Sequence, residues 1–308
     1  MNTTENYHFQ VGNLKCIAIN DWTETFPVET IVKDVSPEQL RQALLEGGYS
    51  QTENTIYYNC LYIQTDQHRI LVDTGMGKDT QQQAKALRDL LQATQPSSMS
   101  AVPALRPRDG ALLDRLQAEG ITPAEIDLVI ITHGDGDHIG GITNSDHQLV
   151  FSKATFVLSK EAWDFWFNAA LVAKWPAFLT AHGRRIFPLI KSRIKVVEPG
   201  DELLPGFQVI SAPGHRPGHT ALAIMSAGEY LLHLADAVGH PILAEHPSWH
   251  GYADTRHDQA EKDRVQLLGQ AVAQQAVVFG PHLPFPGLGR IVPRGEGWRW
   301  QPLDKAAS

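Results

Sequence analysis

The chain has 308 residues, of which 43% are apolar and 19% charged, and its mean hydropathy is −0.22. These values exclude an intrinsically disordered chain and allow a substantial core. The net charge of −8, without a run of Lys and Arg, argues against a protein that binds nucleic acid, which would need a basic track for the phosphates.

Export and membrane insertion are not predicted. Residues 1–6 lack the basic and apolar regions of a signal peptide, and no stretch approaches the roughly 18–20 apolar residues that span a bilayer. The two cysteines, Cys16 and Cys60, lie in apolar strand-like runs. Such positions favour buried free thiols in a reducing compartment over a disulfide. We therefore expect a cytoplasmic protein with no membrane partner.

The first third of the chain predicts three strands and two helices. Alternation of apolar and polar residues or short apolar runs indicate the strands, and the spacing of Leu and Ala indicates the helices. Residues 95–100 resemble a surface loop rather than a domain boundary. The strands are expected at Phe9 to Ile19, Thr55 to Ile63 and Arg69 to Val72, and the helices at Asp79 to Ala93 and Ala111 to Ala118, the last ending at Gly120.

Four side chains that bind metals follow an apolar run, residues 126–131, which predicts a buried strand. Only two glycines separate them, and glycine allows the backbone a tight path past a cation. Such a strand end suits a divalent metal and points to a metalloenzyme. The four residues are His133, Asp135, Asp137 and His138.

Three more candidate ligands, His215, Asp236 and His282, each follow an apolar strand-like run. The seven residues comprise four His and three Asp, enough for two metals that share a bridging carboxylate. Imidazole nitrogen and carboxylate oxygen suit zinc, and also iron or manganese. Other expected elements are strands at 154–159, 194–198, 207–211, 221–226 and 230–235, and a helix at 256–275.

In this order, the motifs resemble the metallo-β-lactamase-fold hydrolases. The matching features are the His/Asp run, Pro213-Gly214-His215, the strand-end Asp236, the late His282 and Asp73-Thr74-Gly75. The ending from His282 to Gly289, with the later Gly297 to Trp300, is similar to the methyl parathion hydrolase branch. This resemblance implies an α/β (α+β) fold, the four-layer αββα sandwich, as a single domain over residues 1–308.

Activity is also implied by the resemblance. We expect a binuclear metal-dependent hydrolase that cleaves a lactone, an aryl or alkyl ester or a phosphotriester of an apolar small molecule, with a metal-bridging hydroxide as nucleophile. His133, Asp135 and His215 would bind one metal, and Asp137, His138 and His282 the other. Asp236 would bridge the two, and Asp137 and Asp236 are the residues we expect to be catalytic.

Asp135 departs from the family, whose members usually have His at this position. Two interpretations stay open: Asp135 is a loop residue beside a damaged site, or it ligates directly after a shift of roughly an ångström or two. A third carboxylate makes the centre less cationic and moves its preference toward iron or manganese. A diiron redox or oxygen-handling protein of this fold is therefore an alternative, as is a pseudoenzyme that binds a ligand with one metal or none.

Further residues are expected around the metals. Asp73, Thr132 and His219 would orient ligands, while His233 is expected to be a core or surface residue. The segment Lys160 to Phe187 is rich in aromatic residues at helical spacing, which predicts a helix that packs on the core or on a partner subunit, lines an apolar substrate pocket, or does both. We expect a homodimer, with Trp163, Trp166, Phe285 and Leu288 in the pocket.

Overall fold

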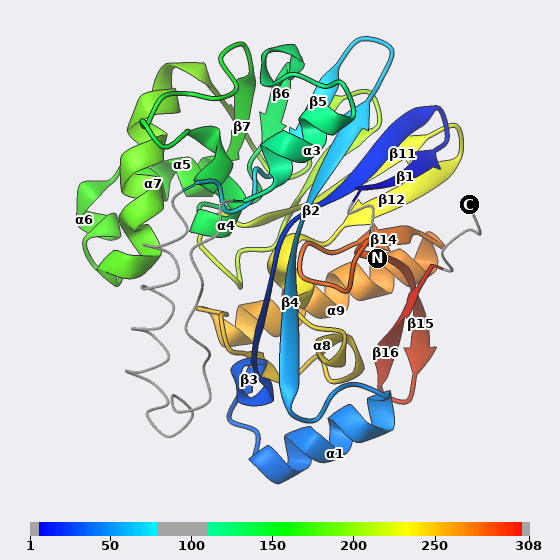
Figure 1. The fold of residues 1–308 in the computed structure, drawn as a ribbon. Helices are drawn as coiled ribbons and strands as arrows, with labels where there is room; N and C mark the ends of the chain where they lie inside the picture. Colours follow the sequence, from blue (N-terminus) through cyan, green and yellow to red (C-terminus); the bar gives the residue numbers. More distant parts are fainter. Residues whose placement is uncertain (1–5, 79–109, 304–308) are drawn as a thin grey trace. The chain divides into compact units, whose positions relative to one another are not determined.

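The computed structural model describes residues 6–78 and 110–303 (Figure 1). The helix expected at Asp79 to Ala93 and the loop at 95–100 lie outside the described residues. The chain divides into two compact units, and the single domain expected over residues 1–308 stays a prediction. Unit 1 comprises Met1–Gln10, Leu14–Thr23 and Tyr58–Glu198, and unit 2 comprises Val11–Asn13, Glu24–Tyr57 and Pro199–Ser308.

Within the described residues, the strands form two seven-stranded sheets and a two-stranded one. The first sheet has the order β1-β2-β4-β5-β6-β7-β8. Its strands are β1 (Asn6–Val11), β2 (Leu14–Pro27), β4 (Glu53–Gln64), β5 (Arg69–Val72), β6 (Leu128–Ile130), β7 (Thr155–Ser159) and β8 (Ile194–Val197). Unit 1 also holds helices α3 (Leu112–Ala118), α4 (Gly136–Ile139), α5 (Lys160–Trp166), α6 (Ala169–Val172) and α7 (Ala177–Ile190).

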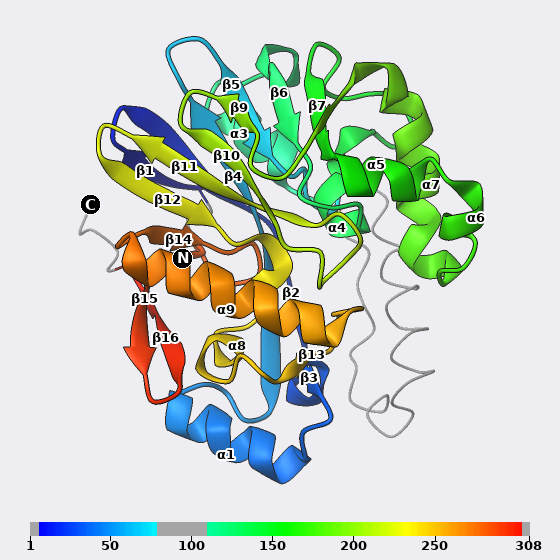
Figure 2. The same ribbon diagram turned by 180° about the vertical axis from the view of Figure 1, so that it is seen from behind.

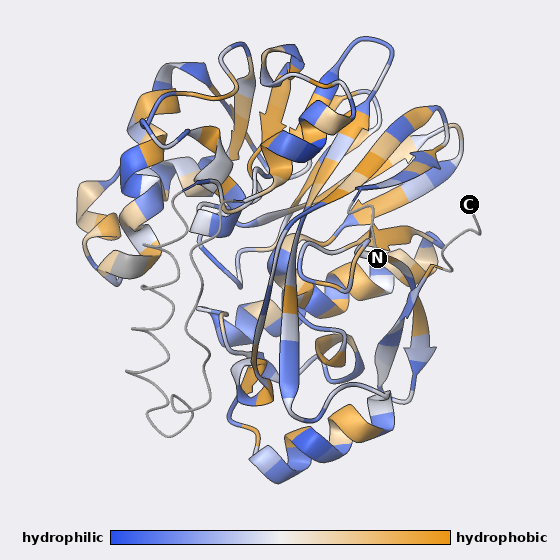
Figure 3. Cartoon of the chain, viewed as in Figure 1, coloured by the Kyte–Doolittle hydropathy of each residue, from blue (hydrophilic) through white to orange (hydrophobic). Residues whose placement is uncertain are grey.

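The central strands β5, β6 and β7 are parallel, with Val72 opposite Ile130 and Ile130 opposite Val157. They are apolar along most of their length (Figure 3), as expected for parallel strands covered on both faces. Parallel strands end at the same edge of a sheet. The residues that follow β5 and β6 are therefore neighbours, and Asp73 N donates to Ile130 O at 2.9 Å.

The second sheet lies in unit 2 and has the order β16-β15-β14-β12-β11-β10-β9. Helix α9 (His257–Ala273) lies along it (Figure 2), because its buried residues Leu267 and Leu268 pack in one cluster with Leu232 and Val278 of the sheet. The strands are β9 (Glu202–Leu204), β10 (Phe207–Ser211), β11 (Thr220–Ser226), β12 (Glu229–His233), β14 (Val277–Phe279), β15 (Leu288–Arg294) and β16 (Gly297–Pro302).

A smaller cluster in unit 2 joins α1 (Pro37–Gly47) and α8 (Ile242–Glu245) through Leu40, Leu44 and Ile242. The two-stranded sheet pairs β3 (Val32–Lys33) with β13 (His250–Gly251). Short 3-10 helices are η1 (Val28–Thr30), η3 (Pro123–Glu125), η4 (Gly140–Ile142), η5 (Lys191–Arg193) and η6 (Ala235–Val238). No helix within residues 6–78 and 110–303 is long and apolar enough to cross a membrane.

Most of the predicted elements are confirmed, and β5 and β10 have the predicted bounds. The single strand predicted from Phe9 to Ile19 is wrong. The chain turns there at Gly12, with a φ of 55°, between β1 and β2. A Cβ at Gly12 would lie 2.1 Å from Ser226 O, so only glycine fits. Both cysteines are buried free thiols, as expected.

Candidate metal centre

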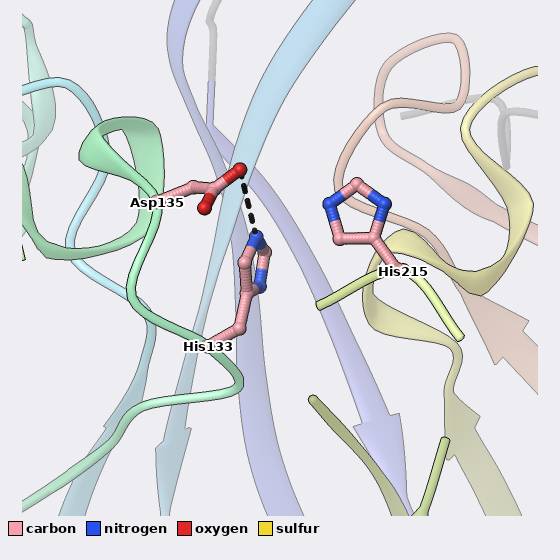
Figure 4. A group of neighbouring side chains, drawn as sticks. All are labelled: His133, Asp135 and His215. Atoms are coloured by element: carbon pink, nitrogen blue, oxygen red, sulfur yellow. Dashed lines mark ion pairs between the residues drawn. The ribbon is translucent and has the colours of Figure 1, made fainter. Parts of the chain in front are cut away.

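The loop after β6 carries the four candidate ligands of unit 1. Asp135 is the N-cap residue of α4 but its side chain does not cap the helix. Its Oδ2 lies 3.8 Å from His133 Nε2 (Figure 4). On the next turn, Asp137 Oδ2 lies 3.3 Å from His138 Nε2. The two imidazole rings are 4.0 Å apart between centroids, so this short loop places four candidate metal ligands side by side.

Asp73 and Thr132 form a buried hydrogen-bonded group beneath this loop. Asp73 Oδ1 accepts from Thr132 N at 2.9 Å, and Oδ2 accepts from Thr132 Oγ1 at 2.8 Å. The same Oδ2 lies 2.8 Å from His138 Nδ1. A carboxylate can only accept, so His138 donates from Nδ1 and keeps the lone pair of Nε2 for a metal. Thr132 Oγ1 also lies 3.1 Å from His133 Nδ1.

In unit 2, two histidines face one carboxylate oxygen. Asp236 Oδ2 lies 3.3 Å from His215 Nε2 and 3.1 Å from His282 Nε2. The Nδ1 atom of each ring also has a hydrogen-bond partner. His215 Nδ1 lies 3.1 Å from Asp254 Oδ1, and His282 Nδ1 donates to Tyr57 O at 2.8 Å. All three candidate ligands are therefore oriented within this unit alone.

Two further histidines hold the turn that presents Asp236. His219 Nε2 accepts from Asp236 N at 2.9 Å, while its Nδ1 donates to Ala212 O at 2.7 Å. His233 is fully buried, and its Nδ1 accepts from Ala235 N at 3.1 Å. Ala235 has a φ of 45°, a strained conformation for a residue with a Cβ. Both imidazoles thus accept backbone N–H groups of η6.

The structure adds Asp254 and Arg264, which the sequence analysis did not single out. Burial favours the neutral form of Asp254, but the hydrogen bond from His215 and the charges of Arg264 and Arg216 outweigh it and lower its pKa. Asp254 follows only the two-residue strand β13, which no apolar run predicts, so its position carries no local signal. Arg264 did carry a local signal, because it lies on the apolar face of α9, between Ala260 and Leu268.

Asp21 on β2 is another buried carboxylate outside the predicted set. It accepts from Met76 N and Leu112 N, each at 2.7 Å. Burial raises its pKa to about 6, even though these backbone hydrogen bonds stabilise the ionised form. A Cβ added at Gly75 or Gly110 would lie within 2.6 Å of its oxygens, so its surroundings are tightly packed.

Trp166 packs directly on the loop that carries the ligands. A Cβ at Gly134 would lie 2.4 Å from Trp166 Nε1, and one at Gly183 would lie 2.2 Å from the same indole. Trp163 instead contacts Phe167, at 4.2 Å between centroids. The two expected pocket residues of unit 2 differ in exposure: Phe285 is half-buried, whereas Leu288 is fully buried in β15.

The residues present fit a divalent metal by their chemistry. Four imidazoles and three carboxylates are borderline to hard ligands that suit zinc, iron or manganese. Each of the four imidazoles has an oxygen within hydrogen-bonding distance of its Nδ1, which leaves Nε2 on the side of a candidate carboxylate. Protein metal sites commonly orient their imidazole ligands in this way.

The chain is similar in sequence to known proteins. A profile of the metallo-beta-lactamase superfamily matches residues 55–282. The chain is 29% identical over 194 residues to metallo-beta-lactamase domain-containing protein 1 of Xenopus laevis, covering 60% of this chain and 65% of that protein. It is 25% identical over 165 residues to N-acyl homoserine lactonase of Bacillus cereus, covering 54% of this chain and 57% of that one. It thus spans less than two thirds of either relative.

Solved structures match over nearly the whole chain. AidC, a dizinc quorum-quenching lactonase in complex with a product, N-hexnoyl-L-homoserine, has a TM-score of 0.81 and 27% identity, covering 96% of this chain and 97% of AidC. AbOPH, a hydrolase in the beta lactamase superfamily, also has a TM-score of 0.81, with 24% identity over 98% of this chain and 99% of that one. The predicted fold class is confirmed.

Proposed function

The chain belongs to the metallo-β-lactamase superfamily, and we propose that it is a binuclear metal-dependent hydrolase of lactones and related esters. Lactones are the first choice because two of the relatives, AidC and the Bacillus cereus protein, are lactonases. Aryl esters and phosphotriesters come next, since the C-terminal motif resembles the methyl parathion hydrolase branch. Fold alone does not decide among these substrates.

We assign three side chains to each metal. His133, Asp135 and His215 would bind one ion, and Asp137, His138 and His282 the other. Asp236 would bridge them. In unit 2, the single oxygen of Asp236 that faces both His215 Nε2 and His282 Nε2 is the observation that carries this proposal. A carboxylate between two imidazoles of different sets suits a shared ligand.

When bound, the metal ions would supply an activated water and polarise the carbonyl or phosphoryl group of the substrate. The protein would fix the ligands in one protonation state. Asp73 keeps a proton on His138 Nδ1, and the Tyr57 carbonyl does so for His282. No Ser or Cys nucleophile is needed for this chemistry.

Trp166 is our choice for the apolar wall of the substrate site, because it contacts the ligand-bearing loop at Gly134. Its ring also lies 4.9 Å from Phe187, which holds it in place. An acyl or aryl group of the substrate would pack on this surface. Trp163, Phe285 and Leu288 stay predictions as pocket residues, as do the homodimer and the cytoplasmic location.

Metal analysis joined to a substrate panel tests the proposal. The purified protein should contain about two metal ions per chain, and complete chelation should abolish hydrolysis of a panel of lactones, aryl esters and phosphotriesters. Adding back zinc or manganese should restore it. His138→Ala should lose the activity, whereas His8→Ala, at a residue with 62% of its side chain exposed, should keep it.

Other outcomes would favour the alternatives. Stoichiometric iron with redox-dependent absorption would favour a diiron protein, for which Asp135 is the motivating residue. Titration of the apoprotein that finds one site or none would favour a pseudoenzyme. Hydrolysis that survives chelation would contradict a metal-dependent mechanism altogether.

A further inference from the structure

Helix α9 carries a buried arginine whose contacts reach two proposed ligands. Arg264 is 1% exposed. Its Nε donates to Ala237 O at 2.9 Å, and Ala237 directly follows the bridging candidate Asp236. On its other side, an Arg264 terminal nitrogen pairs with Asp254 Oδ2 at 2.9 Å, and Asp254 Oδ1 faces His215 Nδ1. One side chain thus contacts the supports of both His215 and Asp236.

The remaining nitrogen of the guanidinium is also occupied. It donates to Pro247 O at 2.6 Å and to Trp249 O at 3.0 Å. A buried charge needs acceptors such as these, because removal from water is costly. An ion pair at such a position adds little stability compared with an apolar side chain of similar volume. The planar guanidinium does fix the relative positions of four acceptors.

The segment around Arg264 packs closely on the His215 loop. Asp263 Oδ2 accepts from Gly214 N at 2.7 Å, and a Cβ at Gly214 would lie 2.1 Å from Ala260 N. His215 O accepts from Thr255 Oγ1 at 2.7 Å. Helix α9 and the segment before it therefore form a rigid support for this loop, and Arg264 extends that support to η6.

We infer that Arg264 is a positioning residue that holds His215, through Asp254, and Asp236, through the Ala237 carbonyl, in one fixed arrangement. The inference rests on the proposed function, since it gives these two residues the role of ligands. The contact with Asp254 fixes the proton on His215 Nδ1 and the plane of its ring. The contact with the Ala237 carbonyl fixes the turn from which the Asp236 carboxylate projects.

Three variants separate the contact with Asp254 from the contact with the Ala237 carbonyl. Arg264→Met keeps the side-chain volume and removes both contacts. Arg264→Lys keeps the charge next to Asp254, but an ammonium cannot reach all four acceptors. Asp254→Asn removes the carboxylate that holds the His215 proton and leaves the Ala237 contact. Lys262→Met, at an exposed residue of the same helix, is the matched control.

Zinc affinity, measured by competition with a chelator, is the first readout. Arg264→Met should weaken zinc binding about 10–100-fold, and Arg264→Lys and Asp254→Asn by less, while Lys262→Met leaves it unchanged. Thermal unfolding of each apoprotein, followed by circular dichroism, reports stability separately. If Arg264→Met lowers the unfolding temperature while zinc affinity stays at the wild-type value, Arg264 is only structural and the inference is overturned.

Nitrogen NMR of the apoprotein, with labelled histidine, is a second readout that needs no metal. Wild-type His215 should show a single tautomer with its proton on Nδ1, and Arg264→Met and Asp254→Asn should both convert it to a mixture. An unchanged His215 signal in both variants would overturn the inference even if the hydrolase activity is found. Conversely, if the wild-type protein binds no metal but the two variants show the expected tautomer change, only the proposed function is overturned.

Discussion

Asp73 Oδ2 and His138 Nδ1 lie 2.8 Å apart, in the interior of unit 1, although the residues are 65 positions apart in the sequence. Asp73 is 3% exposed and His138 is 1% exposed, so water does not compete for this hydrogen bond. The contact decides which nitrogen of His138 keeps a lone pair. It therefore links the end of β5 to the chemistry of the loop after β6.

Asp73→Asn should weaken metal binding about 10–100-fold. The introduced amide group can donate to His138 Nδ1, which would move the histidine proton to Nε2 and remove the lone pair that binds metal. Backbone strain is not the reason, because asparagine tolerates the φ of 58° at this position. Zinc titration of the apoprotein measures the effect, with the exposed Asp66→Asn as control. Equal affinities would contradict the role given to Asp73.

Gly134→Ala should destabilise the protein by about 1–3 kcal/mol, because the new methyl group would overlap the Trp166 indole. In the Trp166→Leu background the same change should cost at least about 1 kcal/mol less. Urea unfolding of the four proteins gives this coupling energy. Gly239→Ala, where nothing lies within 4 Å of the added Cβ, is the control. Additive effects would show that the indole and the loop do not interact.

Asp21 should make stability depend on pH. Its pKa is raised from 3.8 to about 6 in the folded state, so its contribution is fully present below pH 3.8 and is lost as the pH rises through 6. The wild-type apoprotein should lose about 3 kcal/mol from this group between pH 4 and pH 8, a change that Asp21→Asn lacks.

Urea unfolding of the wild type and Asp21→Asn at several pH values checks this. Asp21→Asn should be least stable relative to the wild type at low pH, because only the wild type gains stability there, from the protonation of Asp21. The difference in unfolding free energy should shrink by about 3 kcal/mol toward pH 8. A difference that is the same at both pH values would contradict the raised pKa.

Asp135→His should raise the affinity for zinc relative to manganese by about tenfold, because an imidazole replaces a hard oxygen ligand. Metal competition followed by elemental analysis measures the ratio. Lys153→Met, an exposed residue outside the loop, should leave it unchanged. A ratio that does not move in Asp135→His would indicate that Asp135 is a loop residue rather than a ligand, which is the first of the two interpretations above.

Much of the fold could be predicted because its signals are local. The apolar runs of β5, β6 and β10 are strands, and the apolar face of α9 is buried as its periodicity indicates. The error between Phe9 and Ile19 has a physical cause. The alternation changes phase at Gly12-Asn13, a two-residue turn between β1 and β2 that the prediction included in one strand, and the Ser226 carbonyl leaves room only for glycine at position 12.

The candidate ligands themselves were also accessible to sequence reasoning, because residue type and position after a strand define what a side chain can donate. The protonation of those ligands could not be predicted from the sequence. It depends on Asp73 for His138 and on Asp254 for His215, and Asp254 in turn is held by Arg264. Asp73 was expected to orient a ligand, because it belongs to the motif Asp73-Thr74-Gly75. Asp254 and Arg264 carry no motif, since an aspartate or arginine is usually a surface residue.

The sequence alone thus determined the family, the strand ends and the set of imidazoles and carboxylates, because residue types, short motifs and apolar runs carry these signals. Tertiary structure decided which nitrogen of His138, His215 and His282 holds its proton and which carboxylate faces two rings. The protonation depends on hydrogen bonds between residues that are at least 39 positions apart, and only the packing of strands and helices brings such residues within 3.1 Å of one another.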